Sequence, residues 1–127
     1  MNKTILTTAF LLGFTAVGLG AFGAHALGEV LEFKALESFK TAVYYQMIHS
    51  VVLLIISSFN RFDFKEQQQL FYLFLGGILL FSGSIYVYYL FPLLGIDLNF
   101  VVYLTPIGGI LFLVGWILAA IYTFKKS

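Results

Sequence analysis

The sequence predicts an all-α integral membrane protein, a four-helix bundle with a short interfacial amphipathic helix between its first two membrane spans. Of its 127 residues, 61% are hydrophobic and 10% are charged, and the mean hydropathy is +0.97. Soluble domains are closer to about half apolar and about a quarter charged. The apolar residues also fall into four long runs separated by short polar segments. Residues 1–127 are therefore expected to form a single membrane domain.

The first expected span, residues 4–24, has no charged residue and is long enough to cross about 30 Å of hydrocarbon. An alternative is a cleaved secretory signal, because Lys3, the apolar run and Ala24-His25-Ala26 resemble one. The run is long for the apolar part of a signal, which favours a retained helix. Its small residues also share one helix face, as in closely packed membrane helices. These residues are Gly13, Ala16, Gly20 and Gly23.

Residues 29–40 are amphipathic and predict a helix lying in the membrane interface. Its apolar side is formed by Leu31, Ala35, Leu36 and Phe39, and its charged side by Lys34, Glu37 and Lys40. No glycine or proline separates this segment from the next span. A helix continuing directly into that span is therefore the alternative.

Three further spans are expected at residues 41–59, 70–91 and 100–124. A charged loop at 60–68 and a turn at 92–99 separate them. Pro106 lies early in the last span, where it either kinks the helix or occupies its first turn after Thr105.

The distribution of Lys and Arg predicts the orientation. With four spans, one side of the membrane carries Lys3, Arg61, Lys65, Lys125 and Lys126, whereas the other carries Lys34 and Lys40. Basic residues are enriched in cytoplasmic loops, so we expect a multi-pass protein of the cell (inner, cytoplasmic) membrane with both termini in the cytoplasm. Cleavage of the first segment would leave three spans and an external N-terminus.

Polar residues of different spans are expected at similar depths in the outer half of the bilayer. His49 would lie about 12 Å below the outer surface and Ser84 about 10 Å below it. The expected layer contains Gly18, Gly20, Gln46, His49, Ser82, Ser84, Thr105 and Gly108. A lone polar group in hydrocarbon is costly, so His49 is expected to bond Ser82, Ser84 or a carbonyl. The alternative is a functional role for His49 as a proton carrier or ligand contact.

Few residues suit catalysis or cofactor binding. The chain has no cysteine, which excludes disulfides and thiolate chemistry. A haem held by His25 and His49 is one hypothesis, but their different expected depths are unfavourable. His49 has no acidic partner that would make a serine nucleophile. We therefore expect no catalytic residue, no metal site, no cofactor and, with so few charges, no nucleic-acid partner.

Four motifs together resemble a known family, that of domain of unknown function 423. They are GAFGAHAL (20–27), TAVYYQMIHS (41–50), FSGSIY (81–86) and TPIGGILFLVGW (105–116). This family is found in bacterial inner membranes, and a related mitochondrial set includes transmembrane protein 256. The resemblance implies a four-helix integral membrane protein and no established activity. Its motifs coincide with the polar layer, so the candidate functional residues are His25, Gln46, His49, Ser82, Ser84 and Thr105.

The favoured function is a non-enzymatic helix-packing, accessory or scaffold protein whose partners are the lipid bilayer and either copies of itself or a larger membrane complex. Small residues on spans one, three and four exceed what one four-helix bundle needs. The packing candidates are Gly13, Ala16, Gly20, Gly23, Gly83, Gly108 and Gly115. One alternative is a small transporter or proton-linked carrier with a polar path at Gln46 and His49. Another is a haem- or quinone-binding redox subunit.

Overall fold

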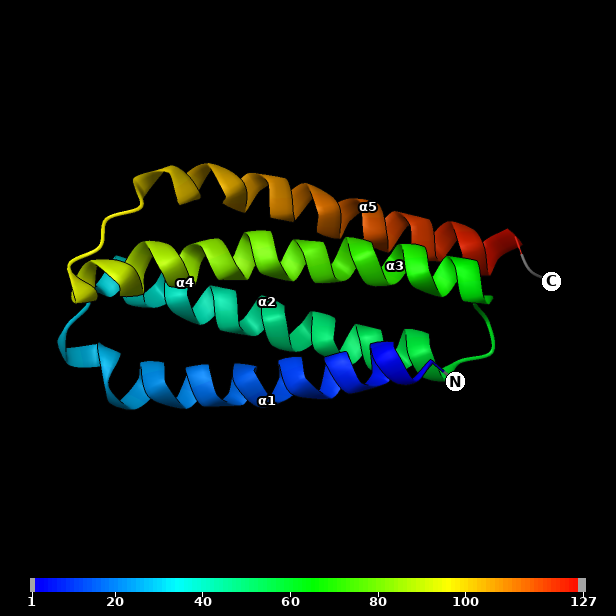
Figure 1. The fold of residues 1–127 in the computed structure, drawn as a ribbon, viewed down its shortest axis with the longest axis horizontal. Helices are drawn as coiled ribbons and strands as arrows, with labels where there is room; N and C mark the ends of the chain where they lie inside the picture. The colour runs from blue at the N-terminus through cyan, green and yellow to red at the C-terminus, as the bar shows by residue number, and fades with distance from the viewer. Residues whose placement is uncertain (1, 126–127) are drawn as a thin grey trace.

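A computed structural model describes residues 2–125 and contains four long helical rods that run back and forth side by side (Figure 1). Two of these rods are single α-helices. The third contains a π-turn in its middle and ends in a 3-10 turn, and the fourth begins with a 3-10 turn. The bounds in chain order are α1 Lys3–His25, η1 Leu27–Glu29, α2 Phe33–Ser58, α3 Phe64–Gly77, η2 Ile78–Ser82, α4 Gly83–Leu90, η3 Phe91–Leu94, η4 Asn99–Tyr103 and α5 Leu104–Lys125.

All four rods are long and apolar enough to cross a membrane. The third span extends from Phe64 to Leu94 and the fourth from Asn99 to Lys125. Both chain ends and the connection between α2 and α3 lie at one end of the molecule, here called the terminal end (Figure 1). The opposite end holds the connections after α1 and after η3, and is called the loop end. Lys126 lies outside the described residues.

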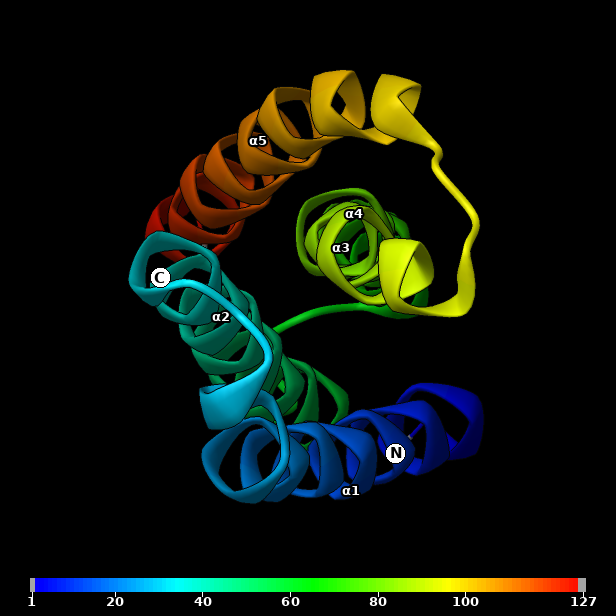
Figure 2. The same ribbon diagram turned by 90° about the vertical axis from the view of Figure 1, so that its left-hand side faces the viewer.

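The rods are arranged in layers (Figure 2). The helix α1 packs mainly on α2, whereas α5 packs mainly on α3 and the neighbouring turn η2. The third span also packs on α2 and so lies between α2 and α5. The two central rods are consequently more buried than α1 and α5, whose apolar side chains are left largely exposed. Such exposed apolar faces suit hydrocarbon surroundings.

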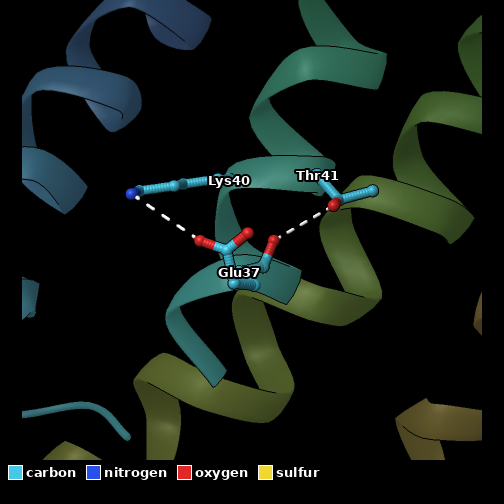
Figure 3. A network of polar contacts seen from close by, with 3 residues as sticks. All are labelled: Glu37, Lys40 and Thr41. Carbon is cyan, nitrogen blue, oxygen red and sulfur yellow. Dashed lines mark hydrogen bonds and ion pairs between the residues drawn. The ribbon is translucent and has the colours of Figure 1, made fainter. Parts of the chain in front are cut away.

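The expected interfacial segment 29–40 does not form a separate helix. After the short turn η1, α2 begins at Phe33 and continues without a break to Ser58. Its charged first turns contain the ion pair between Lys40 Nζ and Glu37 Oε1 at 3.8 Å, and Thr41 Oγ1 donates to Glu37 O at 3.0 Å (Figure 3). Nothing in the sequence interrupts the backbone hydrogen bonds, so the alternative of one continuous helix is the one observed.

The third span starts six residues before its expected boundary, because Asp63 caps α3. The Asp63 side chain accepts from Glu66 N at 2.9 Å, and the Glu66 side chain accepts from Asp63 N at 3.0 Å. This reciprocal capping box satisfies amides that the first turn leaves free. Pro106 lies in the first turn of α5, which is one of the two arrangements expected for it. A π-turn, η2, interrupts the third span in its middle.

The apolar core lies in the half of the molecule nearest the terminal end. It joins the beginning of α1, the end of α2, most of α3 and the middle of α5. Its buried members are Ile5, Ala9, Leu53, Ile56, Phe62, Leu70, Phe71, Phe74, Ile78 and Phe112. Buried polar side chains lie in both halves, and those of the other half include Gln46, Ser82 and Ser84.

Candidate functional site

Gln46 joins three helices. It lies in the middle of α2 and is only 3% exposed. Its Nε2 donates to Leu12 O and to Thr15 Oγ1 of α1, at 2.8 Å in both cases. Its Oε1 accepts from Tyr86 Oη of α4 at 2.6 Å. Both amide hydrogens and the amide oxygen are therefore bonded within the chain.

Ser82 forms a second bond between α2 and the third span. Its hydroxyl is fully buried and donates to Ala42 O, one turn before Gln46, at 2.7 Å. The Phe39 and Tyr86 rings pack beside this bond with their centroids 5.3 Å apart. The first half of α2 is thus bonded to its neighbours on both sides, by Gln46 and by Ser82.

His49 connects α2 to α5 and is 4% exposed. Its Nδ1 lies 2.7 Å from Tyr45 O, and its Nε2 accepts from Trp116 Nε1 at 2.9 Å. A carbonyl only accepts and an indole N–H only donates, so these partners select the neutral tautomer with hydrogen on Nδ1. The ring also stacks on Phe112, with centroids 3.8 Å apart and planes 5° apart. A carbonyl was among the expected partners of His49, but the bond from Trp116 was not.

Ser84 and Thr105 form the bond between α4 and α5, with hydroxyl oxygens 2.5 Å apart. Ser84 Oγ also donates to Phe81 O in η2 at 2.9 Å. Ser82 and Ser84 therefore point to different neighbours, α2 and α5 respectively. Ser82 is the last residue of the π-turn η2 and Ser84 follows it. A π-turn holds about one more residue per turn than an α-helix, and such turns often occur at functional sites.

The polar candidates do not form one connected network. Gln46 bonds to α1 and α4, His49 to α5, Ser82 to Ala42 O of α2, and Ser84 to Thr105. We expected the buried polar side chains to have hydrogen-bond partners, and Gln46, His49 and Ser84 each have one. His25 is apart from them, exposed in the last turn of α1, and its ring has no hydrogen-bond partner within residues 2–125.

The expected packing residues of α1 contact α2. A Cβ added at Gly23 would lie 2.8 Å from the Phe39 ring, and one at Gly20 would lie 3.3 Å from Val43. Ala16 is fully buried, and a Cβ at Gly13 would lie 3.7 Å from Ser50 Oγ. This small-residue face is therefore covered by the chain's own second helix.

The packing glycines of α5 contact the third span. Gly108 lies directly on the η2 backbone, where an added Cβ would overlap Phe81 N. A Cβ at Gly115 would lie 2.9 Å from the Phe74 ring. Gly83, by contrast, meets only Ile78 O of its own span within 4 Å. The small residues of α1 and α5 are thus mostly used in contacts inside one chain.

Neither a haem site nor a transport path is assembled from the candidate residues. Both ring nitrogens of His49 have protein partners, and His25 lies exposed at the end of another helix. Within residues 2–125, no three His, Cys, Asp or Glu side chains come together as a metal site would need. A hollow of about 500 Å³ reaches His49 between Phe81, Leu113 and Trp116. Most of its lining residues belong to α5, among them Pro106, Gly109 and Ile110.

Three residues that complete these contacts were missed by sequence reasoning. Thr15 lies in the first expected span, and Tyr86 and Trp116 lie in two of the four motifs, but none of the three was a candidate residue. Trp116 carries the one indole of the chain, and a buried histidine needs a donor or acceptor for each nitrogen. That requirement could have pointed to Trp116. Nothing comparable marked Thr15, because its role depends on how α1 is rotated against α2.

These features define a small multi-pass membrane protein whose buried polar side chains bond its own helices to one another. The chain belongs to the family described as "Protein of unknown function (DUF423)", which it matches over residues 19–109. The family resemblance expected from the sequence is therefore confirmed.

Full-length relatives support this assignment. The chain is 43% identical to a UPF0382 membrane protein of Haemophilus influenzae, over 100% of this chain and 98% of the relative. It is 37% identical to UPF0382 membrane protein SSP2132 of Staphylococcus saprophyticus, over 97% of this chain and 98% of the relative. With UPF0382 membrane protein YwdK of Bacillus subtilis it shares 30% identity over the same proportions. No solved structure matches the chain. The family description and these names give no activity and no ligand.

Proposed function

We propose that this protein is a non-enzymatic helix-packing protein of the cytoplasmic (inner) membrane, which acts by associating with other membrane helices. The observation that carries the proposal is that its buried polar groups form hydrogen bonds within the chain. Gln46 is bonded through both its amide nitrogen and its amide oxygen, and His49 through both ring nitrogens. Groups engaged in this way hold helices together and are not directed at a substrate.

The surface between α1 and α2 supports association with a further helix. A groove of about 570 Å³ lies there, lined by Gly13, Gly18 and Ser50 among larger apolar side chains. An added Cβ at Gly18 would meet nothing within 4 Å, so this part of α1 is open. Small residues let membrane helices approach closely. In our proposal the partner helix comes from a second copy of this chain or from a larger complex.

The proposed orientation places the terminal end in the cytoplasm. Among the described residues, this end carries Lys3, Arg61, Lys65 and Lys125, and the loop end carries Lys34 and Lys40. The positive-inside tendency favours that arrangement. Single cysteines at Asn60 and Asn99 test it in intact cells with a membrane-impermeant maleimide. Labelling at position 99 alone is expected, and labelling at position 60 alone would contradict the orientation.

Cysteine cross-linking in native membranes tests the association itself, because the chain has no cysteine of its own. Val17→Cys places the thiol at the groove, where Val17 is 62% exposed, and Ile117→Cys places one on the similarly exposed outer face of α5. We expect a cross-linked product from position 17 and little from position 117. A product of twice the chain mass supports self-association, and a product with one defined second chain supports an accessory role. No product, or equal yields at both positions, would contradict the proposal.

A further inference from the structure

The two ends of the molecule differ in charge. Among the described residues, the terminal end carries four basic side chains against two acidic ones, Asp63 and Glu66. The loop end carries four acidic side chains, Glu29, Glu32, Glu37 and Asp97, against two basic ones. Both acidic residues of the terminal end are engaged in the cap of α3. The terminal end is therefore the one suited to an anionic ligand.

A polar pocket of about 470 Å³ opens at this terminal end. It is lined by Asn2, Lys3, Asn60, Phe62, Phe64 and Gln67. These residues come from the beginning of α1, the connection after α2 and the first turn of α3. The pocket lies where these helices end, at the level expected for lipid headgroups. Lys3 is exposed there and brings a positive charge to the pocket.

The amide groups around the pocket have free hydrogen-bonding capacity. Asn2 Oδ1 accepts from Thr4 N and Ile5 N, so the Asn2 Nδ2 points away from the helix and can donate. Gln67 is nine-tenths buried and its Nε2 donates to Ile56 O at 3.2 Å. Its Oε1 accepts from no donor within residues 2–125. The pocket thus offers a cation, amide donors and one acceptor to a ligand.

A second hollow favours a lipid over a free anion. It has a volume of about 620 Å³, and its walls include Ile55, Phe59 and Thr123. The polar pocket and this mainly apolar hollow share Asn60 and Phe62 as wall residues. A ligand with a polar head and a hydrocarbon chain can use both regions, whereas a soluble phosphate compound uses only the first.

We propose that the polar pocket between Lys3, Asn60 and Gln67 binds the headgroup of an anionic glycerophospholipid, with an acyl chain along the neighbouring hollow. The Lys3 ammonium pairs with the phosphodiester, and the Asn2 and Asn60 amides donate to its oxygens. Gln67 Oε1 accepts a hydroxyl of the headgroup. Phosphatidylglycerol has both the charge and the hydroxyls that this arrangement requires. This site does not depend on whether the protein associates with a partner.

Native mass spectrometry of the full chain in detergent tests the proposal, with phosphatidylglycerol, phosphatidylcholine and soluble sn-glycerol 3-phosphate as probes. We expect retention of phosphatidylglycerol in preference to phosphatidylcholine, and no displacement by glycerol phosphate. A basic residue near a membrane surface contributes enough to change binding about fivefold. Lys3→Gln should therefore weaken phosphatidylglycerol retention about fivefold.

Matched variants separate the site from general charge effects. Lys34→Gln removes the same charge at the loop end, and Asn99→Leu matches Asn60→Leu there. Only Lys3→Gln, Asn60→Leu and Gln67→Leu should reduce retention, and Asn60 lies in an exposed connection where folding is little affected. Equal retention in all variants, or equal losses at both ends, would overturn the proposal. Displacement of phosphatidylglycerol by glycerol phosphate would overturn the assignment to a lipid.

Discussion

The two halves of this molecule are held together by different proportions of apolar packing and side-chain hydrogen bonding. Near the terminal end, the contacts between helices are mainly apolar, as around Phe74 and Leu70, and two side-chain hydrogen bonds accompany them, from Gln67 to Ile56 O and from Tyr122 to Gln69. Near the loop end, side-chain hydrogen bonds join the helices, as at Gln46 and Ser84. In hydrocarbon there is no water to compete for a polar group, and apolar side chains gain little from leaving lipid for protein. The terminal-end half therefore depends mainly on close packing, and the loop-end half mainly on partnered polar groups.

The largest expected effect comes from the packed half. Phe74 is fully buried among α2, α3 and α5, and its ring contacts Trp116 and Gly115. Phe74→Ala removes these contacts and leaves a cavity, so the free energy of unfolding should fall by about 3–5 kcal/mol. Phe14→Ala is the control, because Phe14 is 75% exposed on α1. Denaturant titration in mixed micelles measures both. Equal losses would show that Phe74 is not a core residue.

Gly108 tests close approach of two backbones in the polar half. An added methyl group would overlap the backbone of Phe81, which cannot move as a flexible side chain can. Gly108→Ala should therefore destabilise the protein by about 1–3 kcal/mol. The neighbouring Gly109 is the matched control, since an added Cβ there would lie 4.0 Å from the Phe81 ring. Gly109→Ala should be neutral or slightly stabilising. The same denaturant titration compares the two.

The hydroxyl of Tyr86 tests one bond of the polar half. Tyr86→Phe removes the donor to Gln46 Oε1 and keeps the ring that packs on Phe39. The free energy of unfolding should fall by about 0.6–1.7 kcal/mol, between the average and the largest value measured for hydrogen bonds between membrane helices. Tyr44→Phe is the control, because Tyr44 is 62% exposed on the same helix as Gln46. A loss for Tyr44→Phe as large as that for Tyr86→Phe would contradict a specific role for this bond.

The smallest expected change concerns the bond between His49 and Trp116 at the boundary of the two halves. The single tryptophan gives a direct readout. His49→Leu removes the acceptor of the indole N–H, so the Trp116 emission should move to shorter wavelength, with a loss of stability of about 0.6 kcal/mol. His25→Leu, at the exposed end of α1, should leave the emission unchanged. An unchanged spectrum in His49→Leu would show that the bond is not formed.

The fold followed from the sequence to a large extent, and the pairing of side chains did not. Four apolar runs were enough to predict four spans, because every backbone amide in hydrocarbon must be bonded within its own helix. The start of the third span was missed, since the Asp63 cap brought polar residues such as Gln67 into the helix. The π-turn η2 was also missed, because nothing local in Ile78–Ser82 requires it.

The polar residues were predicted individually, but their partners depend on helix rotation. Gln46 and His49 are three residues apart, a spacing that places two side chains on the same side of a helix. They nevertheless bond to helices on different sides, α1 and α4 for Gln46 and α5 for His49. Sequence spacing sets the angle between two side chains around the helix axis. Their partners depend on which helices lie on either side.

A double-mutant cycle between Gln46 and Tyr86 most directly tests whether polar side chains hold the helices of the loop-end half together. The cycle compares Gln46→Leu, Tyr86→Phe and the double variant in one unfolding assay. The account predicts a coupling energy of about 0.6–1.7 kcal/mol, because each single change removes the same bond. A coupling energy indistinguishable from zero would contradict it, since Gln46 and Tyr86 would then contribute to stability independently of each other.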